Sequence, residues 1–274
     1  MTTPRVRLDQ LLVDRGLVDS RTIGRALIMA GDVTVDGCVV DKAGTAVPET
    51  ASVQFKRRPR FVSRAGEKLA HALEALEVDP KGARALDVGA STGGFVDCLL
   101  QHGALEVIAL DVGYGQLDVR LRNDPRVIVM ERVNARWLQP ESLPFSPDLL
   151  TVDVSFISLA KVLPAVIGCM AERFTGLLLV KPQFEAGAER VGKGGIVRDP
   201  EVHEDVLRSV GTTLGDLGLA VDGLCDSGLP GVGGNVEFVF RVDRGRGDRG
   251  RPATLEQMIA KVVHAGNLEG ASGE

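Results

Sequence analysis

The segment from Arg84 to Phe95 constrains the fold of this chain more than any other. It opens with a short apolar run and continues into a turn that contains Gly89, Gly93 and Gly94. Such an apolar run is typical of a buried parallel strand, and glycine lets the backbone turn sharply and approach a ligand closely. From Phe95 the apolar residues recur at helical spacing. The segment therefore predicts a strand, a glycine-rich loop and a helix, whose first N–H groups can face a polar ligand.

The glycine spacing indicates which cofactor such a loop would hold. A dinucleotide loop is G-x-G-x-x-G, whereas this loop is G-x-x-x-G-G and follows Asp87 by two residues. That shape is closer to an S-adenosylmethionine loop, because this cofactor has no pyrophosphate. A second apolar run ends in Asp111, where nucleotide-binding folds hold ribose hydroxyls. A purely structural strand–turn–helix is the alternative. The candidate cofactor-binding residues are Asp87, Gly89, Ser91, Thr92, Gly93, Gly94, Asp111 and Asn134.

Apolar runs that indicate strands alternate with helical segments over most of the chain. The predicted strands are 84–88, 105–111, 126–130, 148–153, 175–181, 219–225 and 235–242. This alternation predicts an α/β fold with a Rossmann-like, doubly wound sheet. Glycine-rich sequence precedes the last strand, which we expect to be inserted antiparallel. Thr254 to His264 predicts a C-terminal helix.

The first 55 residues predict a small α+β module. We expect a short helix from Arg5 to Gly16 with three leucines inward, and a second helix between Ser20 and Gly31. The inner face of that second helix is predicted to hold Ile23, Ala26, Leu27 and Ala30. A hairpin follows over 33–40, where Asp36-Gly37 supplies the positive φ of a tight turn, and a strand over 53–55.

Charge and composition complete the domain plan. The chain has a net charge of −5, yet residues 1–68 carry an excess of four positive charges, which suggests that a polyanion would be held by the front of the chain. The basic run 56–60 contains Pro59 and predicts an interdomain linker. The expected boundaries are 1–55 for the first domain, 56–62 for the linker, 63–243 for the second domain and 244–274 for a polar tether and helical tail.

Other classes of protein find little support in the sequence. No apolar run approaches the ~20 residues of a membrane helix, and no signal region is evident, so we expect a cytoplasmic protein without membrane contact. The four cysteines and four histidines are scattered, so no metal site is expected. The sequence does not indicate an oligomeric state.

Four charged residues are predicted to meet at one edge of the sheet. Asp153 and Lys181 end strands, while Glu237 lies in an apolar strand and Lys68 lies off the apolar stripe of a helix. In open α/β sheets ligands bind at the carboxyl ends of strands. Each residue alone is more often a surface charge or a structural ion pair, but two amines and two acids at matching ends predict a catalytic site.

The first 55 residues resemble the S4-type RNA-binding domain. The resemblance rests on Leu8, Leu11-Leu12, Ser20-Arg21, Ala30-Gly31 and the Val-Asp-Gly turn at 35–37. It implies a module that docks on structured RNA. With the start of the second domain included, the candidate RNA-binding residues are Arg5, Arg7, Arg21, Arg25 and Arg64.

Almost the whole chain resembles the TlyA (haemolysin A-like) ribosomal RNA 2′-O-methyltransferases. The matching segments are Val62-Ser-Arg-Ala-Gly-Glu-Lys-Leu, Leu86 to Phe95, Asp111-Val-Gly-Tyr-Gly, Asp153-Val-Ser-Phe, Lys181-Pro-Gln-Phe-Glu and Gly234-Asn-Val-Glu. The resemblance implies an FtsJ-like domain that methylates a cytidine ribose in 16S or 23S RNA, or both, on ribosomal subunits. It also implies a catalytic Lys-Asp-Lys-Glu tetrad at Lys68, Asp153, Lys181 and Glu237.

The role of Lys181 and two rival functions stay open at this point. Lys181 is the predicted general base, with Lys68 as a like charge that would favour its neutral form, but it could instead orient the hydroxyl and stabilise the oxyanion. A non-catalytic RNA-binding or ribosome assembly factor would need only the first domain. A haemolytic protein would need an amphipathic or spanning element, which the sequence does not show.

Overall fold

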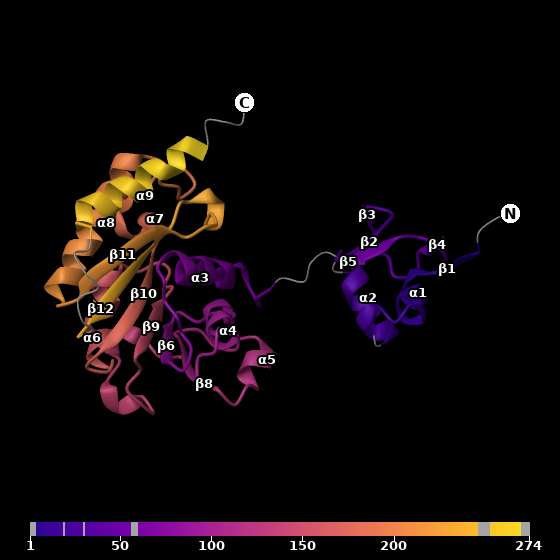
Figure 1. The fold of residues 1–274 in the computed structure, drawn as a ribbon, viewed down its shortest axis with the longest axis horizontal. Coiled ribbons are helices and arrows are strands. Elements are labelled where there is room, and N and C mark those ends of the chain that lie inside the picture. Colours follow the sequence, from indigo (N-terminus) through magenta and orange to yellow (C-terminus); the bar gives the residue numbers. More distant parts are fainter. Residues whose placement is uncertain (1–3, 19, 30, 56–59, 246–252, 270–274) are drawn as a thin grey trace. The chain divides into compact units, whose positions relative to one another are not determined.

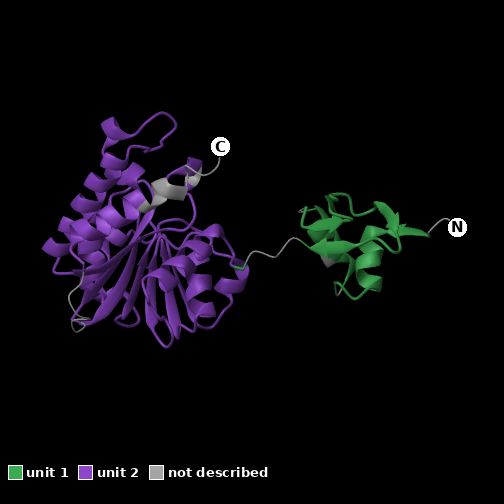
Figure 2. Ribbon diagram, turned by 45° about the horizontal axis from the view of Figure 1, so that its top comes forward, with its two compact units in different colours: residues 1–60 green, residues 61–274 purple. Residues whose placement is uncertain are grey.

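The computed structural model describes the 274-residue chain except residues 1–3, 19, 30, 56–59, 246–252 and 270–274. The chain divides into two compact units, residues 1–60 and 61–274 (Figure 2). Most of the predicted linker, most of the predicted tether, and Ala30 lie outside the described residues. Phe61, which we expected in the linker, is 3% exposed and packs in the core of the larger unit.

The smaller unit joins two helices to two small sheets. Its elements are β1 Arg5–Arg7, α1 Leu8–Asp14, α2 Arg21–Met29, β2 Val33–Val35, β3 Cys38–Val39, β4 Ala46–Pro48 and β5 Val53–Phe55. In the described part, β3, β2 and β5 form one sheet, and β1 pairs with β4. Leu8, Leu11 and Leu12 are buried as predicted. Asp36 and Gly37 both have positive φ in the turn of the hairpin, which is also as predicted.

Two local predictions for the smaller unit were wrong. Arg5–Arg7 is a strand rather than the first turn of a helix, because it pairs antiparallel with Ala46–Pro48, some 40 residues along the chain. On α2, Ala26 is exposed and Ile28 is fully buried, so the inner face differs from the predicted one. Both errors arise from contacts with elements remote in sequence, which override local periodicity.

The larger unit alternates strands and helices (Figure 1). Its elements are α3 Arg64–Ala75, β6 Arg84–Val88, α4 Gly94–Gln101, β7 Glu106–Asp111, α5 Val119–Arg122, β8 Val127–Glu131, η1 Ala135–Trp137, η2 Pro140–Ser142, β9 Leu149–Val152, α6 Leu159–Gly168, β10 Phe174–Val180, α7 Pro182–Glu185, η3 Ala188–Arg190, α8 Pro200–Asp216, β11 Ala220–Asp226, η4 Val232–Gly234, β12 Phe238–Arg244 and α9 Leu255–Glu269. Each predicted strand and the predicted C-terminal helix is present, with ends displaced by a few residues.

Among the described residues, seven strands form one mixed sheet in the order β11-β12-β10-β9-β6-β7-β8. Its neighbouring strands are parallel except for β12, which runs antiparallel between β10 and β11. The predicted antiparallel insertion of the last strand is therefore confirmed. Because Val180 of β10 pairs with Phe238 of β12, the start of β12 lies at the edge where β10 ends.

Helices cover both faces of this sheet (Figure 1). One core joins the sheet to α6, α8 and α9, and the other joins it to α3, α4 and α5. The central strands are buried on both faces, which explains their nearly continuous apolar sequences. The helices thus leave the ends of the strands available for a site.

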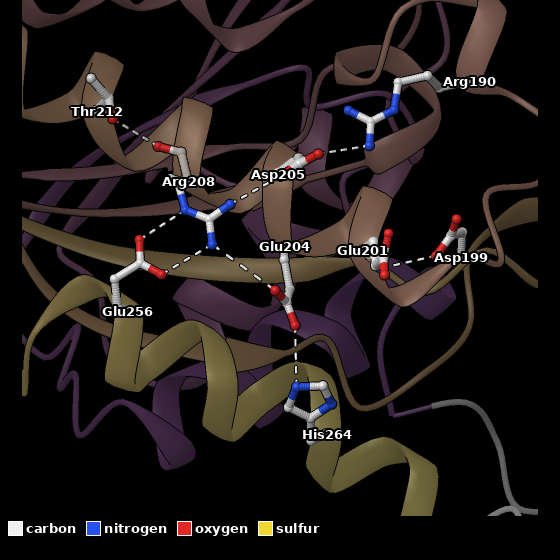
Figure 3. Close-up of polar contacts among 9 residues, drawn as sticks. All are labelled: Arg190, Asp199, Glu201, Glu204, Asp205, Arg208, Thr212, Glu256 and His264. Atoms are coloured by element: carbon white, nitrogen blue, oxygen red, sulfur yellow. Dashed lines mark hydrogen bonds and ion pairs between the residues drawn. The ribbon is translucent and has the colours of Figure 1, made fainter.

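The C-terminal helix α9 is held on α8 by charged contacts (Figure 3). The Arg208 guanidinium of α8 donates to both carboxylate oxygens of Glu256, at 2.9 and 3.0 Å. His264 of α9 lies 3.1 Å from Glu204 of α8. Ile259 and Val263 of α9 are buried in the core below. In the part of the chain that the structure describes, no helix has the length and apolar character of a membrane span.

Candidate active site

A cavity of about 510 Å³ opens at the carboxyl ends of β6, β7 and β9. This is where a doubly wound sheet binds nucleotides, and the volume lies within the range of small-molecule sites, roughly 300–1,000 Å³. Its wall includes the predicted residues Gly89, Ser91, Asp111 and Asn134. It also includes Asp153 of the predicted tetrad.

The loop after β6 requires glycine at two positions. Gly89 has a φ of +89°, and a Cβ there would lie 2.3 Å from the backbone oxygen of Asp153. Gly93 has a φ of +95°, caps α4 and packs against Leu121. A side chain at either position would strain the backbone and displace a neighbour. The loop is thus fitted closely to the strands and helices around it.

Asp111 stands at the end of β7 and shapes the loop beside it. One carboxylate oxygen accepts from the Ser91 N–H at 2.8 Å, and the other accepts from the Gly113 N–H at 2.6 Å. A carboxylate oxygen can accept a second hydrogen bond, so Asp111 can also receive ribose hydroxyls. Asn134 also lines the cavity, and its side-chain oxygen accepts from the Arg136 N–H at 3.1 Å.

A smaller cavity of about 150 Å³ follows the glycine-rich loop. Thr92 and Gly94 line it, together with Ser63, a residue that the sequence reasoning did not single out. The Ser63 hydroxyl is buried and makes no hydrogen bond to any described residue. A buried donor without a partner is costly, so this hydroxyl is suited to a polar ligand group.

The structure places Asp87 below the site rather than on its wall. Its side chain is fully buried, and one oxygen accepts from the Thr151 hydroxyl at 2.7 Å. The other oxygen has no hydrogen-bond partner among the described residues. Burial raises the pKa of Asp87 to about 8, and the nearby Asp153 and Asp111 charges add to the effect, although the Thr151 hydrogen bond opposes it. Asp87 is therefore largely protonated at neutral pH.

The four tetrad residues form two ion pairs at the same edge of the sheet. Lys68 of α3 donates to Glu237 at 2.5 Å, and Glu237 is only 3% exposed. Lys181, which follows β10, pairs with Asp153, which follows β9. Val180 of β10 and Phe238 of β12 are register partners in an antiparallel pair. Lys181 follows Val180 and Glu237 precedes Phe238, so the two residues lie at the same edge of the sheet. The predicted convergence of two amines and two acids is present in the structure.

The pairing also fixes the orientation of the Lys181 side chain. Its Nζ atom donates to the Ser155 hydroxyl at 3.0 Å as well as contacting Asp153. The Lys181 side chain is 12% exposed, so its amine has little freedom to move. Each lysine has its own acid, so the structure gives no direct support to the idea that Lys68 acts on Lys181 as a like charge. The sequence reasoning missed Ser155, which is two residues after Asp153.

An exposed aromatic side chain stands at the mouth of the larger cavity. Phe156 is 90% exposed, has a φ of +64° and lies 5.0 Å from the Phe184 ring. A bulky residue in the left-handed region is strained, and such strain concentrates at functional sites. The sequence reasoning also missed Phe156, because one aromatic residue in a loop carries no periodic signal.

Several candidate RNA-binding arginines have partners within the protein. Arg7 and Arg21 both pair with Asp9, a fully buried carboxylate in the smaller unit. Their hydrogen bonds, Arg7 first, lower the pKa of Asp9 to about 2 against the effect of burial. Arg5 donates to the Ala46 carbonyl at 2.5 Å. Arg25 is exposed and has no ion pair with any described residue, which leaves its charge unpaired.

Arg64 lies in the larger unit, at the start of α3. It is exposed and donates to the Pro230 carbonyl at 3.0 Å. The Pro230 loop precedes Glu237, so Arg64 links α3 to the segment that carries the last tetrad residue. This contact gives Arg64 a structural role whether or not it meets RNA.

Comparisons with known proteins agree with this geometry. The FtsJ-like methyltransferase model matches residues 61–244, and the S4 domain model matches residues 6–53. The "16S/23S rRNA (cytidine-2′-O)-methyltransferase TlyA" of Mycobacterium tuberculosis is 46% identical over 96% of this chain and 98% of that protein. "Hemolysin A" of Brachyspira hyodysenteriae is 38% identical over 85% of this chain and 98% of that protein.

A solved structure gives the same result for the fold. A protein from Streptococcus thermophilus is 36% identical, covers 98% of this chain and 99% of its own, and superposes with a TM-score of 0.73. The match thus spans both units of the chain. The chain belongs to the TlyA family of ribosomal RNA methyltransferases, with an N-terminal S4 domain and an FtsJ-like, S-adenosylmethionine-dependent methyltransferase domain.

Proposed function

We propose that this chain transfers the methyl group of S-adenosylmethionine to the 2′-hydroxyl of a cytidine in ribosomal RNA, with Lys181 as the general base. The observation that carries the proposal is the position of the Lys181–Asp153 pair, because Asp153 also lines the larger cavity. A cofactor bound in this cavity would therefore lie close to the Lys181 amine. The reaction on ribosomal subunits would take place in the cytoplasm.

The residues around the cavity suit the cofactor. Asp111 offers two acceptor oxygens for ribose hydroxyls, and Asn134 lines the same cavity. Ser63 offers a buried hydroxyl without a partner beside the glycine-rich loop, where it can donate to the carboxylate of the methionine moiety. Asp87 lies behind the loop and, being largely protonated, would support the end of β6 through its hydrogen bond with Thr151 rather than contact the cofactor.

The lysine and its partners can perform the proton transfer. When bound, S-adenosylmethionine supplies an electrophilic methyl group on a sulfonium and leaves as a neutral thioether. A neutral Lys181 Nζ takes the proton of the 2′-hydroxyl, and the oxygen then forms the bond to the methyl carbon. Asp153 and Ser155 hold the amine in place, and Asp153 stabilises the ammonium that forms. Lys68 and Glu237 form the second pair and orient the ribose.

The smaller unit is suited to RNA docking. Its exposed, unpaired Arg25 can contact phosphate directly, and Arg7 and Arg21 remain half exposed beside Asp9. In the larger unit, the exposed Phe156 ring offers a stacking face to an unpaired RNA base. Both features favour a single polyanionic substrate over a small molecule.

The proposal is tested by incubating the full chain with labelled S-adenosylmethionine and unmodified ribosomal subunits. We expect label in ribosomal RNA, and nuclease mapping should place it on a cytidine ribose. RNA binding without transfer would favour the assembly-factor alternative. Transfer to a base rather than to a ribose would contradict the proposed chemistry.

Replacing Asp111 should weaken cofactor binding. The Asp111→Ala variant loses the carboxylate that would accept from the ribose, a contribution of about 1.5–3 kcal/mol. We therefore expect S-adenosylmethionine to bind about ten- to a hundredfold more weakly by titration calorimetry. Asp124→Ala, which removes a partly exposed acid paired with Arg126, is the matched control and should bind normally. Unchanged affinity in Asp111→Ala would place the ribose elsewhere.

Arg25 and Arg21 should respond differently to substitution. Arg25→Ala should reduce the slope of log affinity against log salt by about one unit for ribosomal subunits, without a loss of stability, because the side chain has no partner to leave behind. Arg21→Ala should also lower the melting temperature, because the buried Asp9 loses one of two partners. A salt slope that Arg25→Ala does not change would exclude a phosphate contact at that residue.

A further inference from the structure

A second cavity, of about 460 Å³, lies at the same edge of the sheet as the first. It is bounded by the end of β11, the start of β12, the first turn of α8 and the middle of α9. The residues that matter for its chemistry are Arg198, His203, Asp226, Val236, Glu237 and Phe238. None of these is a predicted cofactor residue, and one of them, Glu237, belongs to the tetrad.

The tetrad connects the two cavities. Asp153 lines the first cavity, and Glu237 lines the second. Lys181 directly follows Val180 of β10, and Glu237 directly precedes Phe238, the register partner of Val180 on β12. A ribose held over these residues therefore has the cofactor cavity on one side and the second cavity on the other. If the cofactor fills the first, the second is the space left for the base of the same nucleotide.

The second cavity is lined by a buried histidine, His203, whose ring makes a hydrogen bond through only one of its two nitrogens among the described residues. His203 is 6% exposed, and its Nε2 lies 3.1 Å from the Val197 carbonyl. A carbonyl only accepts, so Nε2 carries the proton, and burial lowers the pKa of His203, which keeps the ring neutral. Its Nδ1 is then a lone-pair acceptor, and it makes no hydrogen bond to any described residue.

The rest of the wall fits a planar heterocycle. Phe238 meets the His203 ring edge-on at 5.5 Å, and Leu229, Val236 and Val262 add apolar surface. The polar groups are mainly acceptors, His203 Nδ1 and the Glu237 carboxylate. Asp226 adds a further carboxylate, which accepts from the Gly228 N–H at 2.7 Å and lies 3.7 Å from His71. The exposed Arg198 supplies a positive charge for a phosphate.

We propose that the second cavity receives the cytosine of the nucleotide whose ribose is methylated, with His203 Nδ1 accepting from its exocyclic amino group. This inference rests on the proposed function and assigns the residue that recognises the base. Cytosine presents an N4 donor where uracil presents an O4 acceptor. Uracil would set its carbonyl oxygen against the Nδ1 lone pair, so the site distinguishes the two pyrimidines at that position.

A binding experiment on the full chain tests the base assignment. With the cofactor cavity saturated by S-adenosylhomocysteine, cytidine 5′-monophosphate should bind about ten times more tightly than uridine 5′-monophosphate in NMR titrations. The His203→Phe variant keeps an aromatic ring but no acceptor, so the two nucleotides should then bind equally. Equal binding to the unmodified chain would overturn the inference. Binding only in the absence of S-adenosylhomocysteine would also overturn it, because the nucleotide would then occupy the cofactor cavity.

A second variant keeps the inference testable if His203→Phe does not fold. Val236 is 43% exposed and lines the cavity, so Val236→Trp should narrow the cavity without disturbing the core. We expect methylation of ribosomal subunits to fall at least tenfold, with S-adenosylmethionine affinity unchanged. Leu105→Trp is the matched control, because Leu105 is also exposed but precedes β7 at the opposite edge of the sheet.

The outcomes separate this inference from the proposed function. If the unmodified chain transfers no methyl group to RNA, the proposed function fails. If it does transfer and Val236→Trp is as active as the Leu105→Trp control, only the base site is wrong.

Discussion

Replacing Lys181 with arginine is expected to reduce methyl transfer to ribosomal subunits by a factor of about 100 to 10,000, the range typical of a lost general base. Arginine keeps the positive charge and the hydrogen-bond donors of lysine but does not lose its proton in a protein. It can therefore pair with Asp153 and yet cannot take the proton of a ribose hydroxyl. Lys181→Ala should be equally impaired. The measurement is the single-turnover rate at saturating S-adenosylmethionine.

Two further measurements separate the general base from an oxyanion stabiliser. S-adenosylmethionine and RNA affinities of Lys181→Arg should match those of the unmodified chain, which excludes a folding defect. Lys161→Arg, at an exposed position on α6, is the matched control and should be fully active. Near-normal transfer by Lys181→Arg would exclude the base and favour a charged donor that stabilises the oxyanion.

Replacing Asp87 with asparagine should change how the stability of the larger unit depends on pH. Asp87 is fully buried, and its pKa is raised from an ordinary value near 3.8 to about 8. Between about pH 4 and pH 8 the unfolded chain has released a proton that the folded chain still holds. Stability therefore falls as pH rises through this window, by at most about 1.4 kcal/mol per pH unit. Asparagine resembles the protonated acid and does not titrate, so this loss should disappear.

The edge of the sheet where the four tetrad residues meet could be predicted from sequence because its signals are local. Each tetrad residue stands at the end of an apolar run or off an apolar stripe, and in a doubly wound sheet such ends converge. The glycine-rich loop carries a spacing of its own, and its φ angles at Gly89 and Gly93 explain that spacing. The convergence of these charges can thus be inferred from the order of residues along the chain.

The pairing of those charges could not be predicted. Whether Lys181 meets Asp153 or Glu237 depends on the register of β10 with β9 and β12 and on the angle at which α3 crosses the sheet. None of these quantities appears in a single stretch of sequence. The same holds for Asp9, whose burial gave Arg7 and Arg21 an internal partner that a helical pattern of arginines does not reveal.

The second cavity shows a further limit of the same kind. Its wall combines residues from the 198–203 segment, the end of β11, the start of β12 and α9, which are separated by up to 65 residues. In the sequence His203 is indistinguishable from any other histidine on a helix. Only its contact with the Val197 carbonyl shows that Nε2 is the bonded nitrogen and that Nδ1 is left as an acceptor. A site whose residues are brought together only by tertiary packing has no recognisable sequence motif, whereas a site at the ends of strands does.

The Asp87 prediction is measured by urea unfolding at pH 5, 6, 7 and 8. The single tryptophan, Trp137, lies in the larger unit, so its fluorescence reports the unfolding of that unit. The advantage of Asp87→Asn over the unmodified chain should grow with pH and reach several kcal/mol at pH 8. Asp216→Asn, an exposed acid at the end of α8, is the control and should show no such trend. A constant difference at every pH would mean that Asp87 is ionised in the folded chain despite its burial, and that the charge of the glycine-rich loop region must be revised.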